Sequence, residues 1–154
     1  MTSPSENLAV VRSRALHIAL WIVQALLSLF FLLAGVAHGL LPIAQAAKNA
    51  PWAADLPVPL VKFIGIAELA GAVGVVLPAL VRILPALTPL AATGLFLMMA
   101  LAIPFHISRG ESRIISMPVV VAILAAFVAW GRFKAARIPA IVFRIAPSAL
   151  DRTR

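Results

Sequence analysis

Three ionisable side chains lie within or beside long apolar runs of this chain, and they are the residues best suited to chemistry. Glu68 is the single carboxylate in the run 60–77, which is long enough to cross a bilayer. An acid at that depth is costly, so we expect it to face the protein interior and to mark a functional site. His38 and His106 lie near the ends of two neighbouring apolar runs. Because histidine titrates near neutral pH, a Glu–His set of this kind is suited to moving protons.

Each of these residues has more than one possible role. Glu68 could donate or relay a proton, because burial favours the protonated form of a carboxylic acid, or it could make a structural hydrogen bond to Gln24 or to a histidine. The histidines could be acid–base partners of Glu68, ligands of a metal or haem, or side chains that simply face lipid headgroups. No closely spaced motif such as His-x-x-x-His is present. We therefore predict no metal site. The sequence does not identify a cofactor, and of the two considered a quinone fits these residues better than haem.

The surrounding chain has the composition of an integral membrane protein. Of its 154 residues, 63% are apolar and 12% are charged, whereas an average soluble domain has about 25% charged residues. The length accommodates about four spans of ~20 residues each. Cysteine is absent, which excludes disulfides, thiolate metal sites and dithiol redox chemistry within this chain. The net charge of +8 lies largely beside the apolar runs, so we expect contact with the lipid bilayer and no nucleic acid.

Prolines and hydropathy divide the chain into four predicted spans, over residues 17–41, 58–77, 85–107 and 113–130. Proline begins or ends nearly every span, since it fits poorly inside a helix. We therefore predict an all-α, antiparallel four-helix membrane bundle over residues 16–131. Residues 1–15 are expected to form a disordered cytoplasmic N-terminus. Residues 132–154 are expected to form a basic cytoplasmic tail that could lie on the membrane as an interfacial helix. A short helix over 43–50 would cover the outer mouth.

The distribution of Lys and Arg predicts that both termini are cytoplasmic in the cell membrane. This orientation places nine of these residues inside and four outside, in agreement with the positive-inside rule. The candidate residues then lie in the outer half, and the polar sequence 109–113 forms a solvated outer turn. Small residues share the helical face of Glu68, which lets another helix approach closely. The predicted catalytic residues are Glu68, His38 and His106, and the predicted ligand-binding residues are Gln24, Gly65, Gly71, Ala72 and Met99.

Four short segments also carry a pattern that extends beyond these single residues. They are AGVAH at 34–38, FIGIAELAGAVG at 63–74, FHISRGE at 105–111 and FVAWGRF at 127–133, and GIAELAG is the most specific part. Together they resemble the DoxX family of small bacterial membrane proteins, in its DoxX-like branch, over about residues 18–133. The resemblance implies a four-helix membrane bundle and an association with redox physiology, because the family is named after a subunit linked to thiosulfate:quinone oxidoreduction. Many relatives have a lysine in place of His38, so the charge at this position would depend on pH in this chain.

Three functions are compatible with these features. The first is a membrane component that binds a small lipophilic molecule, such as a quinone, in an outer-half cavity and supports redox or proton-coupled work with a partner. That partner could be a membrane oxidoreductase subunit. The second is a membrane-embedded isomerase or hydrolase that uses Glu68 and a histidine as acid and base on a lipophilic substrate. The third is a non-catalytic scaffold subunit or homo-oligomer.

Overall fold

Four long helices and several short helical segments make up the structure. The computed structural model describes residues 4–140, with side chains from residue 11 onward. The long helices are α1 (Pro4–Gly35), α3 (Val58–Val81), α4 (Leu87–Ser108) and α5 (Ser116–Trp130). The short elements are the π-helical turn η1 (Val36–Leu40), the helix α2 (Ile43–Asn49), the 3-10 turn η2 (Pro51–Ala54) and the π-helical turn η3 (Gly131–Ala135). The predicted short helix over 43–50 is thus confirmed as α2.

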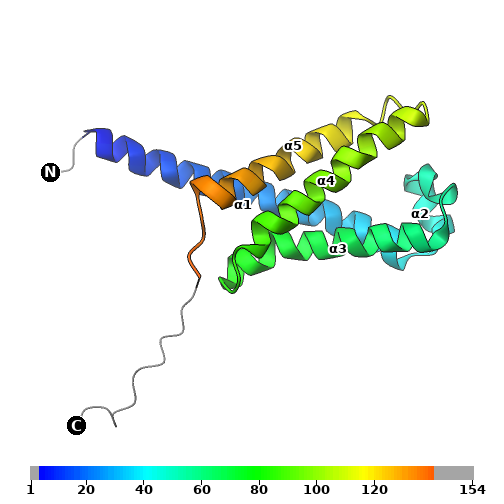
Figure 1. Ribbon diagram of the computed structural model, residues 1–154, viewed down its shortest axis with the longest axis horizontal. Coiled ribbons are helices and arrows are strands. Elements are labelled where there is room, and N and C mark those ends of the chain that lie inside the picture. The colour runs from blue at the N-terminus through cyan, green and yellow to red at the C-terminus, as the bar shows by residue number, and fades with distance from the viewer. Residues whose placement is uncertain (1–3, 141–154) are drawn as a thin grey trace, which may run out of the picture.

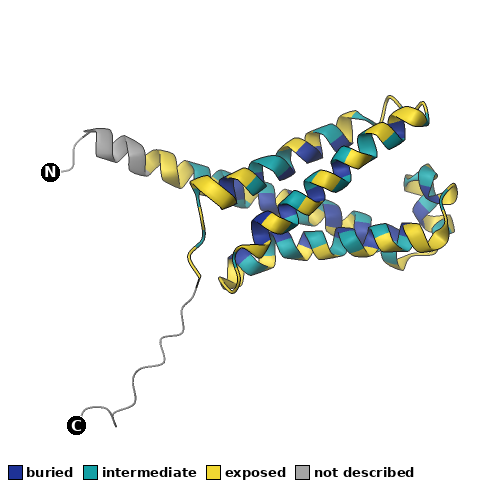
Figure 2. Ribbon diagram, viewed as in Figure 1, coloured by how far each residue is buried: buried dark blue, intermediate teal, exposed yellow. Residues whose placement is uncertain are grey.

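The long helices carry four segments that are long and apolar enough to span a membrane. These segments are Val11–Leu40, Val58–Val81, Leu87–Ser108 and Ser116–Ala135. Their outer faces are also apolar, with Leu101 72% exposed and Phe63 68% exposed, and Figure 2 shows exposed residues along the outer sides of the helices. A helix that is apolar on all sides belongs in hydrocarbon. The predicted all-α membrane bundle is therefore confirmed.

The helices are arranged as two pairs. α1 packs against α3, and α4 packs against α5, while contacts between α3 and α4 join the pairs. Figure 1 shows that the pairs lie close together near η3 and diverge towards α2. We call these two ends the Arg132 end and the α2 end. The core is formed mainly by Leu20, Leu27, Phe31, Ala72, Val75, Ala92, Leu95, Met99, Ala125 and Val128.

The first two spans are longer than the sequence predicted. α1 begins at Pro4, so residues 4–15 continue this helix instead of forming a disordered terminus. Proline suits the first position of a helix, and residues 5–34 contain no proline or glycine that would end it. α3 runs through Pro78 to Val81. Proline is tolerated inside membrane helices where neighbouring helices pack around it, so it is a weaker stop signal here than in a soluble protein.

The last span also continues beyond its predicted end. Gly131 does not terminate α5, because η3 carries the helical chain on to Ala135. Residues 137–140 are not helical. The rest of the predicted interfacial tail, residues 141–154, lies outside the described residues.

Close contact between η1 and α3 determines where His38 lies. A Cβ added at Gly65 would overlap the backbone of Gly39 and lie 2.6 Å from the carbonyl carbon of His38. A Cβ added at Gly35 would lie 2.8 Å from the carbonyl oxygen of Gly65. Small residues at such a crossing let two helix backbones touch. Gly65, for which we expected a ligand contact, therefore has a packing role in the structure.

Substitution of Gly65 by alanine should weaken this crossing. The added methyl group would force η1 away from α3, and overpacking of this kind costs about 1–3 kcal/mol. The expected result is a lower midpoint of thermal unfolding for purified Gly65→Ala protein in detergent, followed by circular dichroism. Gly94→Ala is the matched control, because nothing lies within 4 Å of a Cβ at that position. The control should be neutral or stabilised by up to about 1 kcal/mol through helix propensity. Equal midpoints for the two variants would contradict the close crossing.

Candidate functional site

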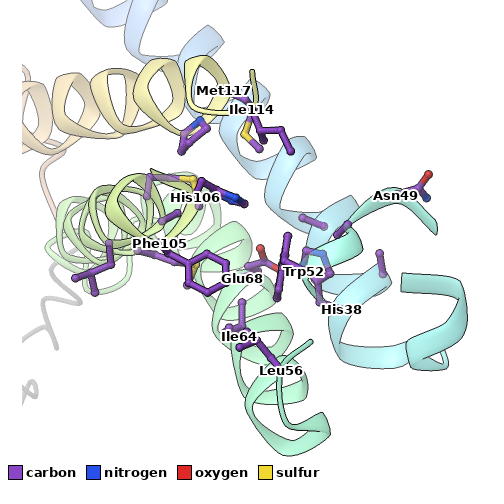
Figure 3. Close-up of a pocket in the computed structure, with 18 of the residues that line it drawn as sticks. His38, Asn49, Trp52, Leu56, Ile64, Glu68, Phe105, His106, Ile114 and Met117 are labelled. Carbon is purple, nitrogen blue, oxygen red and sulfur yellow. Dashed lines mark hydrogen bonds and ion pairs between the residues drawn. The ribbon is translucent and has the colours of Figure 1, made fainter. Parts of the chain in front are cut away.

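A cavity of about 740 Å³ lies between the helix pairs at the α2 end. Its walls are formed by α1, η1, α3, α4, the start of α5 and the segment 49–56. Three residues singled out from the sequence, His38, Glu68 and His106, line this cavity, as does Met99. Figure 3 shows His38, Glu68 and His106 converging from different helical segments on one space. The volume lies within the range of about 300–1,000 Å³ that is usual for small-molecule sites.

Glu68 is buried in this wall and paired with His38. Its Oε2 lies 2.7 Å from Nδ1 of His38, and the two residues are 5% and 8% exposed. They come from α3 and η1, whose backbones meet at the glycine contact described above. When Glu68 is ionised it accepts the Nδ1–H of His38, which leaves Nε2 as the unprotonated nitrogen. Among the described residues, Nε2 of His38 has no hydrogen-bond partner.

His106 pairs with a carboxylate other than Glu68. Its Nδ1 lies 2.6 Å from Oε2 of Glu111, and not beside Glu68. Glu111 also accepts a hydrogen bond from Nε of Arg109, at 2.9 Å, and the same guanidinium donates to Oδ2 of Asp55 at 2.6 Å. The predicted solvated turn at 109–113 is thus partly a structural element, since it supplies the carboxylate that orients His106.

Charge pairing in this turn changes the titration of two groups outside the spans. The hydrogen bond with His106, together with Arg109, holds the pKa of the Glu111 carboxyl below its ordinary value. Hydrogen bonds to Asp55 and Glu111 raise the pKa of Arg109. Glu111 is therefore kept ionised, and Nδ1 of His106 keeps a negatively charged acceptor.

Aromatic rings connect the two histidines across the cavity wall. Trp52 lies 4.9 Å from the ring of His38 and 6.4 Å from that of Phe105, measured between ring centroids. Phe105 in turn lies 5.4 Å from His106. Trp52 and Phe105 both line the cavity. Two carboxylate–histidine pairs therefore flank an aromatic wall, and each presents Nε2 as its remaining ring nitrogen.

Four of the predicted ligand-binding residues do not line this cavity: Gln24, Gly65, Gly71 and Ala72. The amide of Gln24 donates to a backbone carbonyl of α3 and accepts from Nε of Arg132, so it belongs to the Arg132 end. A Cβ at Gly71 would overlap Leu95, and Ala72 is a core residue. The small residues on the Glu68 face of α3 therefore pack against neighbouring helices, as helical periodicity implied, and do not themselves line the cavity.

Sequence reasoning missed three residues of the site: Trp52, Asp55 and Glu111. The first two lie in the loop after α2, whose position depends on how the bundle packs. Glu111 had a local signal, because it follows His106 by five residues across a turn containing Gly110, whose φ is +72°. A positive φ favours glycine and reverses the chain within a few residues, which brings the two side chains together.

The hydrogen bonds that His38 and His106 already make limit which of their ring nitrogens could bind a cofactor. No group of three or more His, Cys, Asp or Glu suited to a metal ion occurs among the side chains of residues 11–140. Haem ligation would have to use Nε2 of both His38 and His106, since Nδ1 of each is bonded to a carboxylate.

A comparison with protein-family models shows which family the chain belongs to. The model of the DoxX-like family matches residues 22–128. The chain belongs to the DoxX-like family. All the residues that line the cavity fall within the matched segment, as do both carboxylate–histidine pairs. His17 and Arg132, at the other end of the bundle, fall outside it. No curated protein and no solved structure matches the chain.

Removal of the Glu111 carboxylate should make the melting temperature of the protein less sensitive to acidic pH. The folded-state pKa of Glu111 is lowered, so its stabilising effect is complete above the ordinary value of 4.5 and is lost as pH falls through the folded value. We expect the wild-type melting temperature to fall between about pH 5 and about pH 3, and that of Glu111→Gln to fall less. Ser112→Ala, in the same turn, should retain the wild-type profile. Parallel profiles for wild type and Glu111→Gln would show that the pairing with His106 and Arg109 does not stabilise the fold.

Proposed function

We propose that this DoxX-like protein binds a quinone-like lipophilic molecule in the cavity and supports redox or proton-coupled work with a partner. One observation carries the proposal. Two histidines, each held through Nδ1 by a carboxylate, line the same largely apolar cavity. Small-molecule sites typically combine apolar walls with a few polar groups that fix the orientation of the ligand.

The hydrogen-bonding groups suit a flat ring with two oxygen substituents. With its carboxylate ionised, each pair offers an Nε2 acceptor to a hydroxyl group of a quinol. When the imidazole is protonated, the same Nε2–H donates to a carbonyl group of a quinone. Trp52 and Phe105 provide aromatic surface between the pairs, against which a ring can stack.

The route into the cavity also favours a lipophilic ligand. Leu33 and Leu101 line the cavity and are 64% and 72% exposed, on helices that span the membrane. The cavity is therefore bordered by side chains that meet lipid. A molecule dissolved in the bilayer could reach it without crossing water.

Proton transfer would use both pairs. Oxidation of a quinol to a quinone releases two protons and two electrons. His38 and His106 can each accept one proton at Nε2, and the neighbouring carboxylate stabilises the imidazolium that forms. The chain has no cysteine, so the electrons would pass to a partner, such as a membrane oxidoreductase subunit. Reduction of a quinone would run the same steps in reverse.

The buried His38–Glu68 pair favours an acid–base enzyme as the second candidate. A histidine oriented by a buried carboxylate, with Nε2 towards a substrate cavity, is a general-base arrangement. In that case a lipophilic substrate would be isomerised or hydrolysed without electron transfer. Glu68→Gln would then lower turnover while substrate binding remained.

Quinone binding can be measured through Trp52. A Trp21→Phe/Trp130→Phe background leaves Trp52 as the sole tryptophan, and a short-chain ubiquinone analogue bound in the cavity should quench its fluorescence. Glu68→Gln in this background should weaken binding about tenfold or more, through loss of a charge-assisted hydrogen bond. Thr93→Ala is the control, because Thr93 bonds to a carbonyl of its own helix outside the cavity. Quenching that does not saturate, or that is the same in both variants, would rule out the proposed site.

We also propose that both termini face the cytoplasm in the cell membrane, on the basis of the Lys and Arg distribution. The chain lacks cysteine, so single cysteines can report orientation. A membrane-impermeant maleimide should label Ser112→Cys, between α4 and α5, in intact cells. Ile83→Cys, between α3 and α4, should react only after the cells are permeabilised. The reverse pattern would invert the proposed topology.

A further inference from the structure

A second cluster of polar side chains lies at the Arg132 end, away from the cavity. Arg132 is only 4% exposed, although arginine is almost never buried without a charged partner. Its Nε donates to Oε1 of Gln24 at 2.7 Å, and its Nη1 lies 3.3 Å from both Nδ1 of His17 and the carbonyl oxygen of Ala136. The guanidinium carbon lies 5.2 Å from the centroid of the Trp21 ring. All of these partners are uncharged groups or, for His17, an imidazole.

This cluster has no carboxylate among the described side chains. Asp55, Glu68 and Glu111 are all engaged at the α2 end. In addition, Nη2 of Arg132 is buried without a hydrogen-bond partner. A buried charge without an opposite charge is costly, so the arrangement calls for an anion from outside these residues.

His17 shows that the cluster has more donors than acceptors. Its Nδ1 faces Nη1 of Arg132, and its Nε2 lies 3.1 Å from the indole Nε1 of Trp21. Both neighbours can only donate, whereas a neutral imidazole accepts at one nitrogen alone. The indole N–H of Trp21 is placed to donate to Nε2, which leaves the proton of a neutral imidazole on Nδ1, facing the guanidinium. With the other tautomer, the N–H of Nε2 faces the N–H of Trp21 instead. In either case an oxygen atom beside the facing N–H groups would accept from both.

A small pocket is present at this point. It has a volume of about 200 Å³ and is lined by His17, Trp21 and Arg82, together with apolar residues of α3 and of the segment after η3. Arg132 lies behind the first two of these residues, within the contact distances given above. The pocket lies where the spanning segment of α3 ends, at Val81. Lipid phosphates lie at the level where membrane helices end.

We propose that this pocket binds a phosphate group, held by Arg82, His17 and Trp21 and stabilised by the charge of Arg132 behind them. Phosphate provides several acceptor oxygens for the N–H donors that converge here and supplies the missing negative charge. The phosphate belongs either to the headgroup of an anionic lipid or to a soluble molecule. The site is separate from the cavity and does not depend on the function proposed for it.

Lipid and soluble phosphate can be distinguished by thermal unfolding of the full chain in a neutral detergent. The additives are phosphatidylglycerol, phosphatidylcholine and inorganic phosphate, and chloride at equal ionic strength is the control for inorganic phosphate. For each additive, the midpoint of thermal unfolding is measured as a function of its concentration. Arg82→Gln is the main variant, because Arg82 is exposed and its loss should not prevent folding. Arg113→Gln is the matched control, since it removes the same charge from an exposed residue at the other end of the bundle.

Wild type and Arg113→Gln should be stabilised by phosphatidylglycerol, and Arg82→Gln should require about tenfold more lipid for the same shift. Stabilisation by inorganic phosphate with the same dependence on Arg82 would instead identify a soluble ligand. Arg132→Gln should bind no phosphate if it folds, but the proposal does not rest on that variant. If no probe distinguishes Arg82→Gln from Arg113→Gln, the proposal is wrong.

Discussion

The packing of this protein depends on a partner for the Glu68 carboxylate, which lies within a membrane-spanning helix. Glu68 is buried in α3, and its partner His38 comes from a different helical segment. The pair can form only if η1 and α3 lie close enough for a 2.7 Å contact between the two side chains. Gly65 provides that proximity, because the backbone of Gly39 occupies the space where a Cβ would be. The glycine crossing and the polar pair are therefore one structural unit.

The two carboxylate–histidine pairs share one bonding pattern but differ in their access to water. The side chains of His38 and Glu68 are 11% and 6% exposed. The second pair reaches the surface, because Glu111 is bonded to Arg109, and Arg109 to the largely exposed Asp55. Under the proposed function, a proton accepted at His106 could leave through Glu111, whose side chain is 22% exposed. A proton accepted at His38 would stay in a low-dielectric environment, where Glu68 would compensate its charge.

Most of the fold could be predicted from the sequence because its physical causes are local. Hydropathy and proline positions gave four spans, and all four are present. Errors arose at the ends: the second span was ended before Pro78 and the last at residue 130, although both helical segments continue. Of the site, His38, Glu68 and His106 could be identified because ionisable groups are rare in membrane spans. The position of Trp52 could not, since it depends on how the segment after α2 folds over the bundle. The pairing of His106 with Glu111 had a local signal in the turn at Gly110, which our sequence reasoning did not use.

Gln24 illustrates how a correctly noticed residue can have a different role from the one expected. An amide in an apolar span must find partners, and we expected them at the cavity. Instead, its side chain connects α1 to the carbonyl oxygen of Val75 on α3 and to Arg132 on η3. The first bond lies within the α1–α3 pair, and the second links that pair to the chain that continues α5, at the Arg132 end.

At the α2 end, the ion pair between Asp55 and Arg109 connects the loop after η2 to the end of α4. The pairs diverge between these two connections, and the cavity lies on the divergent side. Polar contacts therefore connect the helix pairs at both ends of the bundle, and the cavity is open in the structure without a bound molecule. Under the proposed function, a lipophilic ligand would enter a site that is already formed, so little of its binding energy would be spent on rearranging the helices.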